Sequence, residues 1–376
     1  MNKIYLDNAS TTAIHPDVIA EMSRVMQEDF GNPSSTHSFG RSAKVVLETA
    51  RKSIAKHLNC SAQELIFTSG GTEANNWILQ NAIKNLSVVR IISTKIEHHA
   101  VLYPILELQK ETGIEVCFLS IQPDGTIDYA ELLTLLADEK PTLVSLMHVN
   151  NETGVVLDLN RVGAMCKLHQ AYFHSDTVQS IGKTAFNLAE TPIDFLVASA
   201  HKFHGPKGVG FAFIRKNTRL GAMFLGGEQE KGLRAGTEAV HQIAGMAKAL
   251  EICYEHLEAN RQKIANLKMF TWQRLQETFP EVKSNGSVAT TFYSLLNVQL
   301  PIAEEQTTMI LFALDMKGIA VSRGSACQSG SVRPSHVLAE MLSENDLKKL
   351  SIRISFSYTS SKEEVLFLVA VLKELV

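Results

Sequence analysis

The stretch DFLVASAHKFHGPKGVG, residues 194–210, decides the fold that the sequence predicts. Residues 195–199 are apolar or small and are typical of a buried strand, and a polar turn with a lysine between two histidines follows at once. Ligands of α/β sheets lie at the ends of such strands. Lys202 could therefore form a Schiff base with an aldehyde cofactor if it is partly desolvated, and the alternative is a solvated surface lysine.

Short apolar runs alternate with helical patterns on both sides of this stretch. The alternation predicts an α/β layer architecture with a large, mostly parallel sheet of seven strands. The run that ends at residue 214 follows a Gly-Pro turn and could be an antiparallel strand. Helices are expected between several strands, for example over 72–84 and 160–170. The expected strands cover 64–68, 88–93, 115–119, 143–147, 171–174, 195–199 and 209–214.

The pattern changes in the last third of the chain. Residues 239–279 are typical of two long helices, which could link two domains. A chain of 376 residues is also too long for one small core. The segments that follow predict a smaller α+β domain, with strands at 290–300, 319–322 and 351–356 and helices at 304–317 and 362–375.

The composition excludes several classes of protein. Hydrophobic residues make up 45% of the chain and charged residues 20%, which is ordinary for a soluble globular protein. The formal net charge of −3 gives no reason to expect nucleic acid or an anionic membrane as a partner. There is no apolar run long enough to span a bilayer and no pattern of a signal peptide, so we expect a cytoplasmic protein. The five cysteines include no Cys-x-x-Cys pair, so neither a disulfide framework nor a metal site is predicted.

A carboxylate follows another predicted strand, in HSDTVQS (174–180). Asp176 could pair with a pyridinium nitrogen and keep it protonated, which makes the ring an electron sink. Gln179 could reach the phenolic oxygen of the same ring. The alternative is that Asp176 caps a helix and that Gln179 lies in its first turn, and both interpretations can hold together.

A glycine turn joins a predicted strand to a predicted helix in TSGGTEANN (68–76). Free backbone N–H groups and the helix dipole could bind a phosphate there, with Thr72 donating a hydroxyl hydrogen bond. The alternative is an ordinary helix start capped by Thr72, and it is favoured when the motif is taken alone.

Two further residues have side chains suited to catalysis. His98 follows Glu97 after another predicted strand and could stack on a flat ring and move protons, or it could be a surface histidine. Cys327 lies in the glycine- and serine-rich stretch VSRGSACQSGS (321–331), a composition that favours exposure and mobility. An exposed thiol on a mobile arm suits a nucleophile, and the alternative is an incidental loop thiol.

The order of these motifs resembles that of the cysteine desulfurases, pyridoxal-phosphate (PLP) enzymes of the class-V aminotransferase group. Those enzymes supply sulfur for iron–sulfur cluster assembly and tRNA thiolation. The resemblance runs almost end to end. It is carried by YLDNASTT (5–12), GNPSSTH (31–37), GTE (71–73), EH (97–98), HVNNETG (148–154), Asp176 with Gln179, SAHK (199–202), RAGT (234–237), GSAC (324–327) and SIRIS (351–355).

The resemblance implies a role for each candidate residue. Lys202 would hold PLP, Asp176 would pair with its ring nitrogen, Gln179 with its phenolic oxygen, and His98 would stack on the ring and act as acid and base. The phosphate would be bound by Gly71, Thr72, Ser199 and His201, with Thr237 reaching the phosphate of the neighbouring subunit. Asn151 and Arg353 would fix the substrate carboxylate, Arg353 by a two-pronged ion pair.

The resemblance also implies the reaction and the organisation of the protein. L-Cysteine would become L-alanine, and Cys327 would carry the sulfur as a persulfide to an acceptor protein, either a cluster scaffold or a tRNA-thiolating enzyme. Cys327 could also hold an iron–sulfur cluster transiently. The fold would be that of type I PLP transferases in a homodimer, with a large domain over 14–258 and a small domain made of 1–13 and 259–376.

Some residues depart from the family pattern. Ser10 stands where the family usually has a second alanine, and Ser357-Tyr358 stand where it has Gly-Arg, so Tyr358 could alter hydrogen bonding near Arg353. Three rival functions remain open at this point. A selenocysteine lyase or an aminotransferase would have the same fold, and a catalytically silent partner protein would use PLP only structurally.

Overall fold

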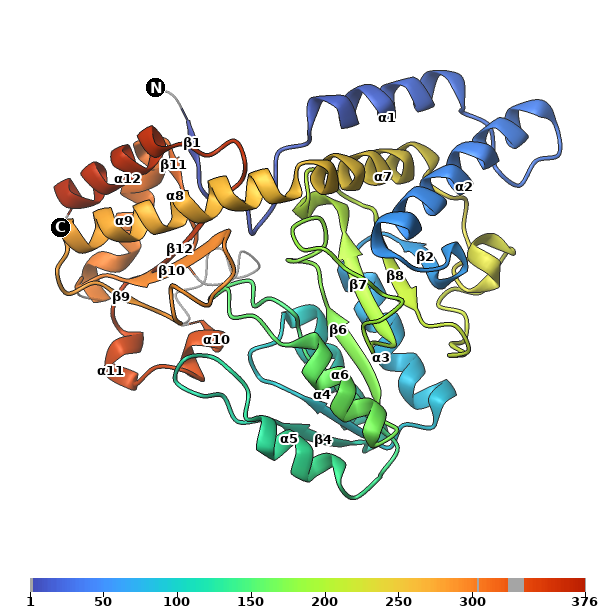
Figure 1. Ribbon diagram of the computed structural model, residues 1–376, viewed down its shortest axis with the longest axis horizontal. Helices are drawn as coiled ribbons and strands as arrows, with labels where there is room; N and C mark the ends of the chain where they lie inside the picture. The colour runs from blue at the N-terminus through green and yellow to red at the C-terminus, as the bar shows by residue number, and fades with distance from the viewer. Residues whose placement is uncertain (1–2, 303, 324–334, 376) are drawn as a thin grey trace.

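A computed structural model describes residues 3–302, 304–323 and 335–375, with the backbone alone for 304–308 (Figure 1). Its largest sheet has seven strands in the order β2-β8-β7-β6-β5-β3-β4. Strand β8 runs antiparallel to both of its neighbours, and the other adjacent pairs are parallel. The predicted α/β class with a mostly parallel sheet is therefore confirmed. The strands are β2 (Leu65–Thr68), β3 (Arg90–Ser93), β4 (Glu115–Phe118), β5 (Thr142–Ser145), β6 (Tyr172–Asp176), β7 (Phe195–Ser199) and β8 (Gly210–Ile214).

Both faces of this sheet are covered by helices, because its strands are apolar on both sides. Successive side chains of a strand point to opposite faces, and in β7 Phe195 and Val197 join one apolar cluster while Leu196 and Ala198 join another. The first cluster packs against α3 (Gly71–Leu86) and α4 (His99–Thr112). The second packs against α2 (Ser38–Leu58), α5 (Tyr129–Leu136), α6 (Leu159–Leu168) and α7 (Val240–Glu255).

Two helices near the N-terminus, α1 (Pro16–Glu28) and α2, pack on α7 and were not expected from the sequence. Each follows a histidine cap. The side chain of His15 accepts the N–H of Asp17, and that of His37 accepts the N–H of Gly40. Histidine is not among the residues that ordinarily cap a helix, although Pro16 and Asp17 in the first turn of α1 are ordinary start signals.

A second core lies at the other end of the molecule (Figure 1). This core is built partly on an antiparallel sheet with the strand order β12-β10-β9. The strands are β9 (Lys283–Ser284), β10 (Leu295–Gln299) and β12 (Ser351–Ser355). Strand β1 (Ile4–Tyr5) pairs in parallel with β11 (Ile319–Ala320), so the N-terminus joins the C-terminal part of the chain. The division at residues 13/14 and 258/259 stays a prediction. The helices here are α8 (Leu257–Thr278), α9 (Glu304–Met316), α10 (His336–Ala339), α11 (Glu344–Leu347) and α12 (Lys362–Leu375).

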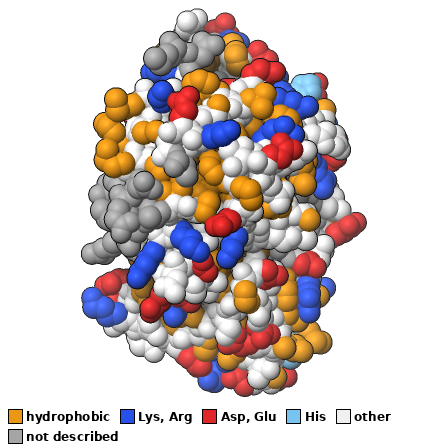
Figure 2. All heavy atoms as spheres, turned by 90° about the vertical axis from the view of Figure 1, so that its left-hand side faces the viewer, with side chains coloured by type: hydrophobic (Ala, Val, Ile, Leu, Met, Phe, Trp, Pro, Cys, Tyr) orange, Lys and Arg blue, Asp and Glu red, His pale blue; other side chains and the backbone are white. Residues whose placement is uncertain are grey.

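The surface of this end carries charges of both signs. Figure 2 shows Lys and Arg side chains interspersed with Asp and Glu and with hydrophobic groups on the side where α9 and α12 lie. Within the described ranges, no helix is both long enough and apolar enough to cross a membrane.

A buried ion pair ties a surface segment to the sheet. Arg51 of α2 donates from Nη2 and Nη1 to the two carboxylate oxygens of Glu230, at 2.6 and 2.9 Å. Glu230 lies in the short 3-10 helix η3 (Gln229–Gly232), and it also accepts the N–H of Phe67 in β2. Both charged side chains are almost fully buried. The other 3-10 helices are η1 (Ala62–Glu64) and η2 (Ala200–Lys202).

We expect Glu230→Ala to lower the free energy of unfolding by about 3–5 kcal/mol, because it leaves the Arg51 charge buried without its buried partner. The matched control is Glu48→Ala, which removes a half-exposed partner of the same arginine and should cost less than about 0.5 kcal/mol. Urea unfolding of both variants measures the difference. Equal losses in the two variants would contradict this account.

Candidate active site

A cavity of about 240 Å³ lies where the loops after β6 and β7 meet the N-terminus of α3. All the predicted site residues line it except Thr237 and Cys327. The N-terminal segment and β12 of the second core complete its wall. The lining residues are Ala9, Ser10, Gly71, Thr72, Asn75, His98, Ala100, Met147, Asn151, Asp176, Val178, Gln179, Ser199, His201, Lys202 and Arg353.

Lys202 ends the short helix η2 directly after β7, so the predicted turn brings its side chain into the cavity. Its Nζ atom donates to the carbonyl oxygens of Ala9 at 2.7 Å and Ser10 at 2.8 Å. The same N-terminal segment is fixed at Thr12, whose N–H and hydroxyl both donate to the carbonyl of His201 at 2.9 Å. Lys202 therefore connects the end of β7 to the N-terminal segment, which is far from it in the sequence.

Asp176 ends β6 and is held by a chain of hydrogen bonds. Its Oδ2 atom accepts from Nδ2 of Asn75 at 2.8 Å, and the amide oxygen of Asn75 lies 3.0 Å from Nε2 of His174. His174 also bonds to the hydroxyl of Ser145 at 2.8 Å through Nδ1. Asn75 and His174 were not predicted from the sequence as site residues. The signal for His174 was its position two residues before Asp176, which puts both on one face of a strand.

Gln179 is buried and donates from Nε2 to the carbonyl of Ala9 at 2.8 Å. Residues 178–183 form consecutive turns and no helix follows Asp176, so the alternative of a helix that begins there is wrong. The Asp176 carboxylate caps the first of these turns, since its Oδ1 accepts the N–H of Val178 at 3.0 Å. A side-chain amide has two N–H donors, so Gln179 keeps one beyond its bond to Ala9.

The turn before α3 forms a tight cradle. Gly70 has a φ of +152°, and no side chain caps the helix, so the alternative of a Thr72 cap is wrong. A Cβ on Gly71 would meet Cγ2 of Val178 at 2.6 Å, which leaves no room for a side chain. Gly71 and Thr72 at this uncapped helix start line the cavity together with Ser199 and His201. This is a donor set that suits an anion.

His98 is the N-cap of α4, and its Nδ1 accepts the N–H of Ala100 at 3.1 Å. Burial lowers the pKa of His98, and the carboxylate of Asp176 opposes that shift. His99 lies in a different stack, between the rings of Tyr103 at 4.5 Å and His336 at 4.4 Å. Of the two adjacent histidines, only His98 lines the cavity.

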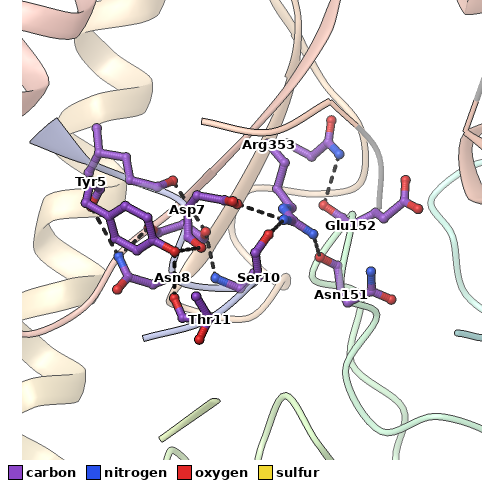
Figure 3. A network of polar contacts seen from close by, with 12 residues as sticks. Tyr5, Asp7, Asn8, Ser10, Thr11, Asn151, Glu152 and Arg353 are labelled. Atoms are coloured by element: carbon purple, nitrogen blue, oxygen red, sulfur yellow. Dashed lines mark hydrogen bonds and ion pairs between the residues drawn. The ribbon is translucent and has the colours of Figure 1, made fainter. Parts of the chain in front are cut away.

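Arg353 of β12 is 1% exposed and lines the cavity from the second core. Figure 3 shows its guanidinium group pointing toward Asp7, Ser10 and Asn151. Its Nη1 donates to the carbonyl of Asn151 at 2.8 Å. Its Nη2 donates both to Oδ1 of Asp7 at 2.8 Å and to Oγ of Ser10 at 2.6 Å. Asp7 and Ser10 were not predicted as site residues, because their contacts with Arg353 join residues more than 340 positions apart.

Tyr358 does not line this cavity. Its ring lies 4.7 Å from that of His204, and both residues border a separate small cavity with Lys183. The expectation that Tyr358 alters the hydrogen bonds of Arg353 has no support among the described contacts.

Two predicted residues lie elsewhere. Thr237 is exposed and outside the cavity. Cys327 lies outside the described residues. On one side of that segment Ser322 exchanges backbone hydrogen bonds with Arg353, and on the other Ser335 donates its hydroxyl to Glu152. Both flanks are thus attached beside residues of the cavity wall.

Comparison with known proteins gives consistent matches. The family model of the class-V aminotransferases matches residues 4–368. "Cysteine desulfurase IscS" of Dictyoglomus turgidum is 37% identical over all of this chain and 94% of its own length. "Putative cysteine desulfurase IscS 1" of Bacillus subtilis is 39% identical over 97% of this chain and 96% of its own.

Solved structures agree with these sequence matches. A "NIFS-LIKE PROTEIN" superposes with a TM-score of 0.91 at 34% identity and covers 100% of this chain and 99% of its own. A structure described as "SspA in complex with cysteine" has a TM-score of 0.82 at 29% identity, with coverages of 96% and 100%.

Two buried histidines make the fold sensitive to acid. Burial lowers the pKa of His148 and of His174 from 6.5 to about 4. The unfolded chain takes up these protons near pH 6.5 and the folded chain only near pH 4. The unfolded state therefore binds more protons in this window, and stability is lost as the pH falls through it.

We expect the free energy of unfolding to fall between pH 6.5 and 5, by about 1.4 kcal/mol per pH unit for each histidine that stays neutral. Urea unfolding at half-unit steps of pH measures the slope. His148→Asn removes one of these proton-binding rings and should make the slope shallower. An unchanged slope in this variant would contradict the neutral state of the His148 ring, and the comparison with the parent cancels the opposing contribution of Glu97, whose pKa burial raises to about 8.

Proposed function

We propose, on the premise that the chain belongs to the class-V aminotransferase family, that it is a PLP-dependent cysteine desulfurase. It would convert L-cysteine to L-alanine and pass the sulfur on for iron–sulfur cluster assembly, tRNA thiolation or both. Relatives named as cysteine desulfurases match the chain over nearly its full length. The observation that carries the proposal is the convergence of Lys202, Asp176 and Arg353 on one cavity.

The residues of the cavity fit PLP. Gly71 and the uncapped start of α3 would hold the phosphate with Thr72, Ser199 and His201. Asp176 would accept from the protonated ring nitrogen, and the remaining N–H of Gln179 would serve the phenolic oxygen. His98 would cover the ring, and Lys202 would bind the aldehyde carbon. When bound, PLP supplies an electron-withdrawing ring that weakens bonds at the α-carbon of an amino acid.

Lys202 would also move the proton of the substrate α-carbon. Its flexible stem lets Nζ swing, while the carbonyls of Ala9 and Ser10 keep that atom inside the cavity. His98 has its Nδ1 occupied by the N–H of Ala100, so its Nε2 is the atom that can exchange a proton with substrate.

Arg353 and Asn151 would hold the substrate carboxylate. The guanidinium is buried on the wall of the cavity, and the backbone carbonyl of Asn151 fixes its orientation. A carboxylate bound there directs the α-carbon of an amino acid toward Lys202, because Ser10 contacts both Lys202 and Arg353.

Cys327 would receive the sulfur. L-Cysteine and the thiol of the enzyme would become L-alanine and an enzyme persulfide. The C–S bond of the substrate breaks and an S–S bond to Cys327 forms, and the β-carbon takes up the proton that the Cys327 thiol gives up, so atoms and electrons balance. Cys327 is four residues beyond Arg323, a reach of up to about 14 Å for extended chain. The attachment of Ser322 to Arg353 puts the start of that reach at the cavity wall.

A homodimer would complete the site through Thr237, which would bind the phosphate in the partner's cavity. Thr237 is exposed three residues after Arg234, and Arg234 is bonded to Glu73 in the first turn of α3 at 2.9 Å. The same segment exposes Leu225, at 95%, and Phe224, at 48%. Such groups suit burial against a second copy of the chain. The sulfur would go on to an acceptor protein in the cytoplasm, either a cluster scaffold or a tRNA-thiolating enzyme.

We expect the purified protein to be yellow and to release sulfide from L-cysteine in the presence of a reductant. Lys202→Ala should lose both the colour and the activity. Cys327→Ala should keep the colour and lose sulfide release, and Cys166→Ala, which removes a buried thiol of α6, serves as its control. Parental turnover by the Cys327→Ala protein would rule out the assigned nucleophile.

The role of Thr237 can be tested with mixed dimers. We expect Thr237→Val to weaken PLP binding about tenfold, as the loss of one hydrogen bond to a charged group does. A mixed dimer of Thr237→Val and Lys202→Ala chains should regain one site of parental affinity, since that site takes Lys202 and Thr237 from different subunits. Absorbance titration with PLP measures this, and failure to regain the site would show that Thr237 does not act across the interface.

A further inference from the structure

We infer that Ser10 is a further substrate-binding residue, whose hydroxyl group donates to the α-carboxylate of the amino acid while it accepts from Arg353. This inference rests on the proposed function, because it assigns the carboxylate of an amino acid to this side of the cavity. Ser10 lines the cavity, and it is not among the residues that the sequence analysis assigned to the site.

Ser10 joins the two groups that an amino acid must meet at once. Its backbone carbonyl accepts from Nζ of Lys202 at 2.8 Å, and its side-chain oxygen accepts from Nη2 of Arg353 at 2.6 Å. In an amino acid the carboxylate is bonded directly to the α-carbon. A residue that contacts both Lys202 and Arg353 therefore lies beside that bond when substrate is present.

The hydrogen bonds of Arg353 leave neither edge of its guanidinium group free to bind a carboxylate through two parallel N–H bonds. A guanidinium has five N–H donors, and either of its edges that can hold a carboxylate by two parallel bonds includes Nη2. Asp7 and Ser10 take both hydrogens of Nη2, and Asn151 takes one of Nη1. Among the described residues, Nε is buried without an acceptor. The expected two-pronged pair would have to displace Asp7 or Ser10.

The Ser10 hydroxyl resolves this conflict without displacement. An oxygen that accepts from Nη2 still has its own O–H to donate, and no other hydrogen bond of that hydroxyl is present among the described contacts. A carboxylate can take that O–H together with one of the N–H groups left on Arg353. Bonds to an ionised acceptor of this kind are the strong ones.

The charge of Asp7 makes the extra donor valuable. The Asp7 carboxylate lies 2.8 Å from Nη2 and is 16% exposed, so it offsets much of the Arg353 charge at short range. An ion pair that is already formed attracts a second carboxylate less than a lone guanidinium does. A neutral hydroxyl supplies a donor without bringing a further charge that must be desolvated.

The test compares two probes on the holoenzyme. 3-(Methylthio)propionate has a carboxylate and no amino group, and 2-(methylthio)ethylamine has an amino group and no carboxylate. We expect Ser10→Ala to weaken binding of the first about tenfold by calorimetry and to leave the second within about twofold. The KM for L-cysteine should rise about tenfold while kcat stays within about twofold, because the bond is made to the substrate before and during the reaction.

Tyr5→Phe is the matched control. The single O–H of Tyr5 is shared between the carbonyls of Thr11 at 2.9 Å and Asp7 at 3.1 Å and so fixes the same segment, and Tyr5 makes no hydrogen bond to Arg353 among the described contacts. This variant should bind both probes as the parent does.

Three results would overturn the assignment of Ser10. They are undiminished binding of the carboxylate probe by Ser10→Ala, equal weakening of both probes, and the same carboxylate-specific loss in Tyr5→Phe. Failure of the proposed function looks different. The parent protein would then bind the carboxylate probe in a Ser10-dependent way and yet produce no alanine from L-cysteine.

Discussion

The site depends on the packing of residues 7–12 between the two cores, where hydrogen bonds hold this segment on both sides. On one side the N–H of Ala9 donates to the hydroxyl of Ser355 in β12 at 2.9 Å. On the other side Lys202 and Thr12 tie the same segment to the end of β7. Neither sheet contains the cavity by itself. The lysine comes from one core and the arginine from the other, and the distance between them is set by the short strip of backbone that both of them bind.

Much of the fold follows from local patterns in the sequence. The helix over 362–375 has the bounds that its periodicity indicated, and the buried strands, among them 195–199, lie where continuous apolar runs predicted them. These elements are specified by residues that are close together in the chain. The N-terminal helices are different, because both are capped by histidine, which is not a usual cap, and only α1 has the ordinary start signals Pro16 and Asp17. The predicted strand over 290–300 is shorter in the structure, since Lys268 binds the carbonyls of Thr291 and Phe292 outside the sheet.

The candidate site also contains residues that could be predicted from the sequence and residues that could not. Residues next to a strand end, such as Asp176 and Lys202, could be found from the sequence because position along a strand determines where they point. The residues that hold these side chains in place by hydrogen bonds could not be found in this way. Asn75 reaches Asp176 from a helix 101 residues earlier, and Asp7 reaches Arg353 across 346 residues. Such pairs are created by packing of distant elements, and no local pattern encodes them. The roles of the lining residues remain proposals, and that of Cys327 lies outside what the structure describes.

The pairing of β1 with β11 affects the order in which the protein can fold during its synthesis on the ribosome. Ile4 is among the first residues to be synthesised, and its partner Ile319 follows more than three hundred residues later. The large sheet, whose strands all lie between residues 65 and 214, has the sequence it needs long before that. Throughout this interval the N-terminal segment has no strand to join. Translation thus separates the two stages in time: a nascent chain can build its main scaffold early, but it gains the ability to hold an amino acid only when its last strand has emerged.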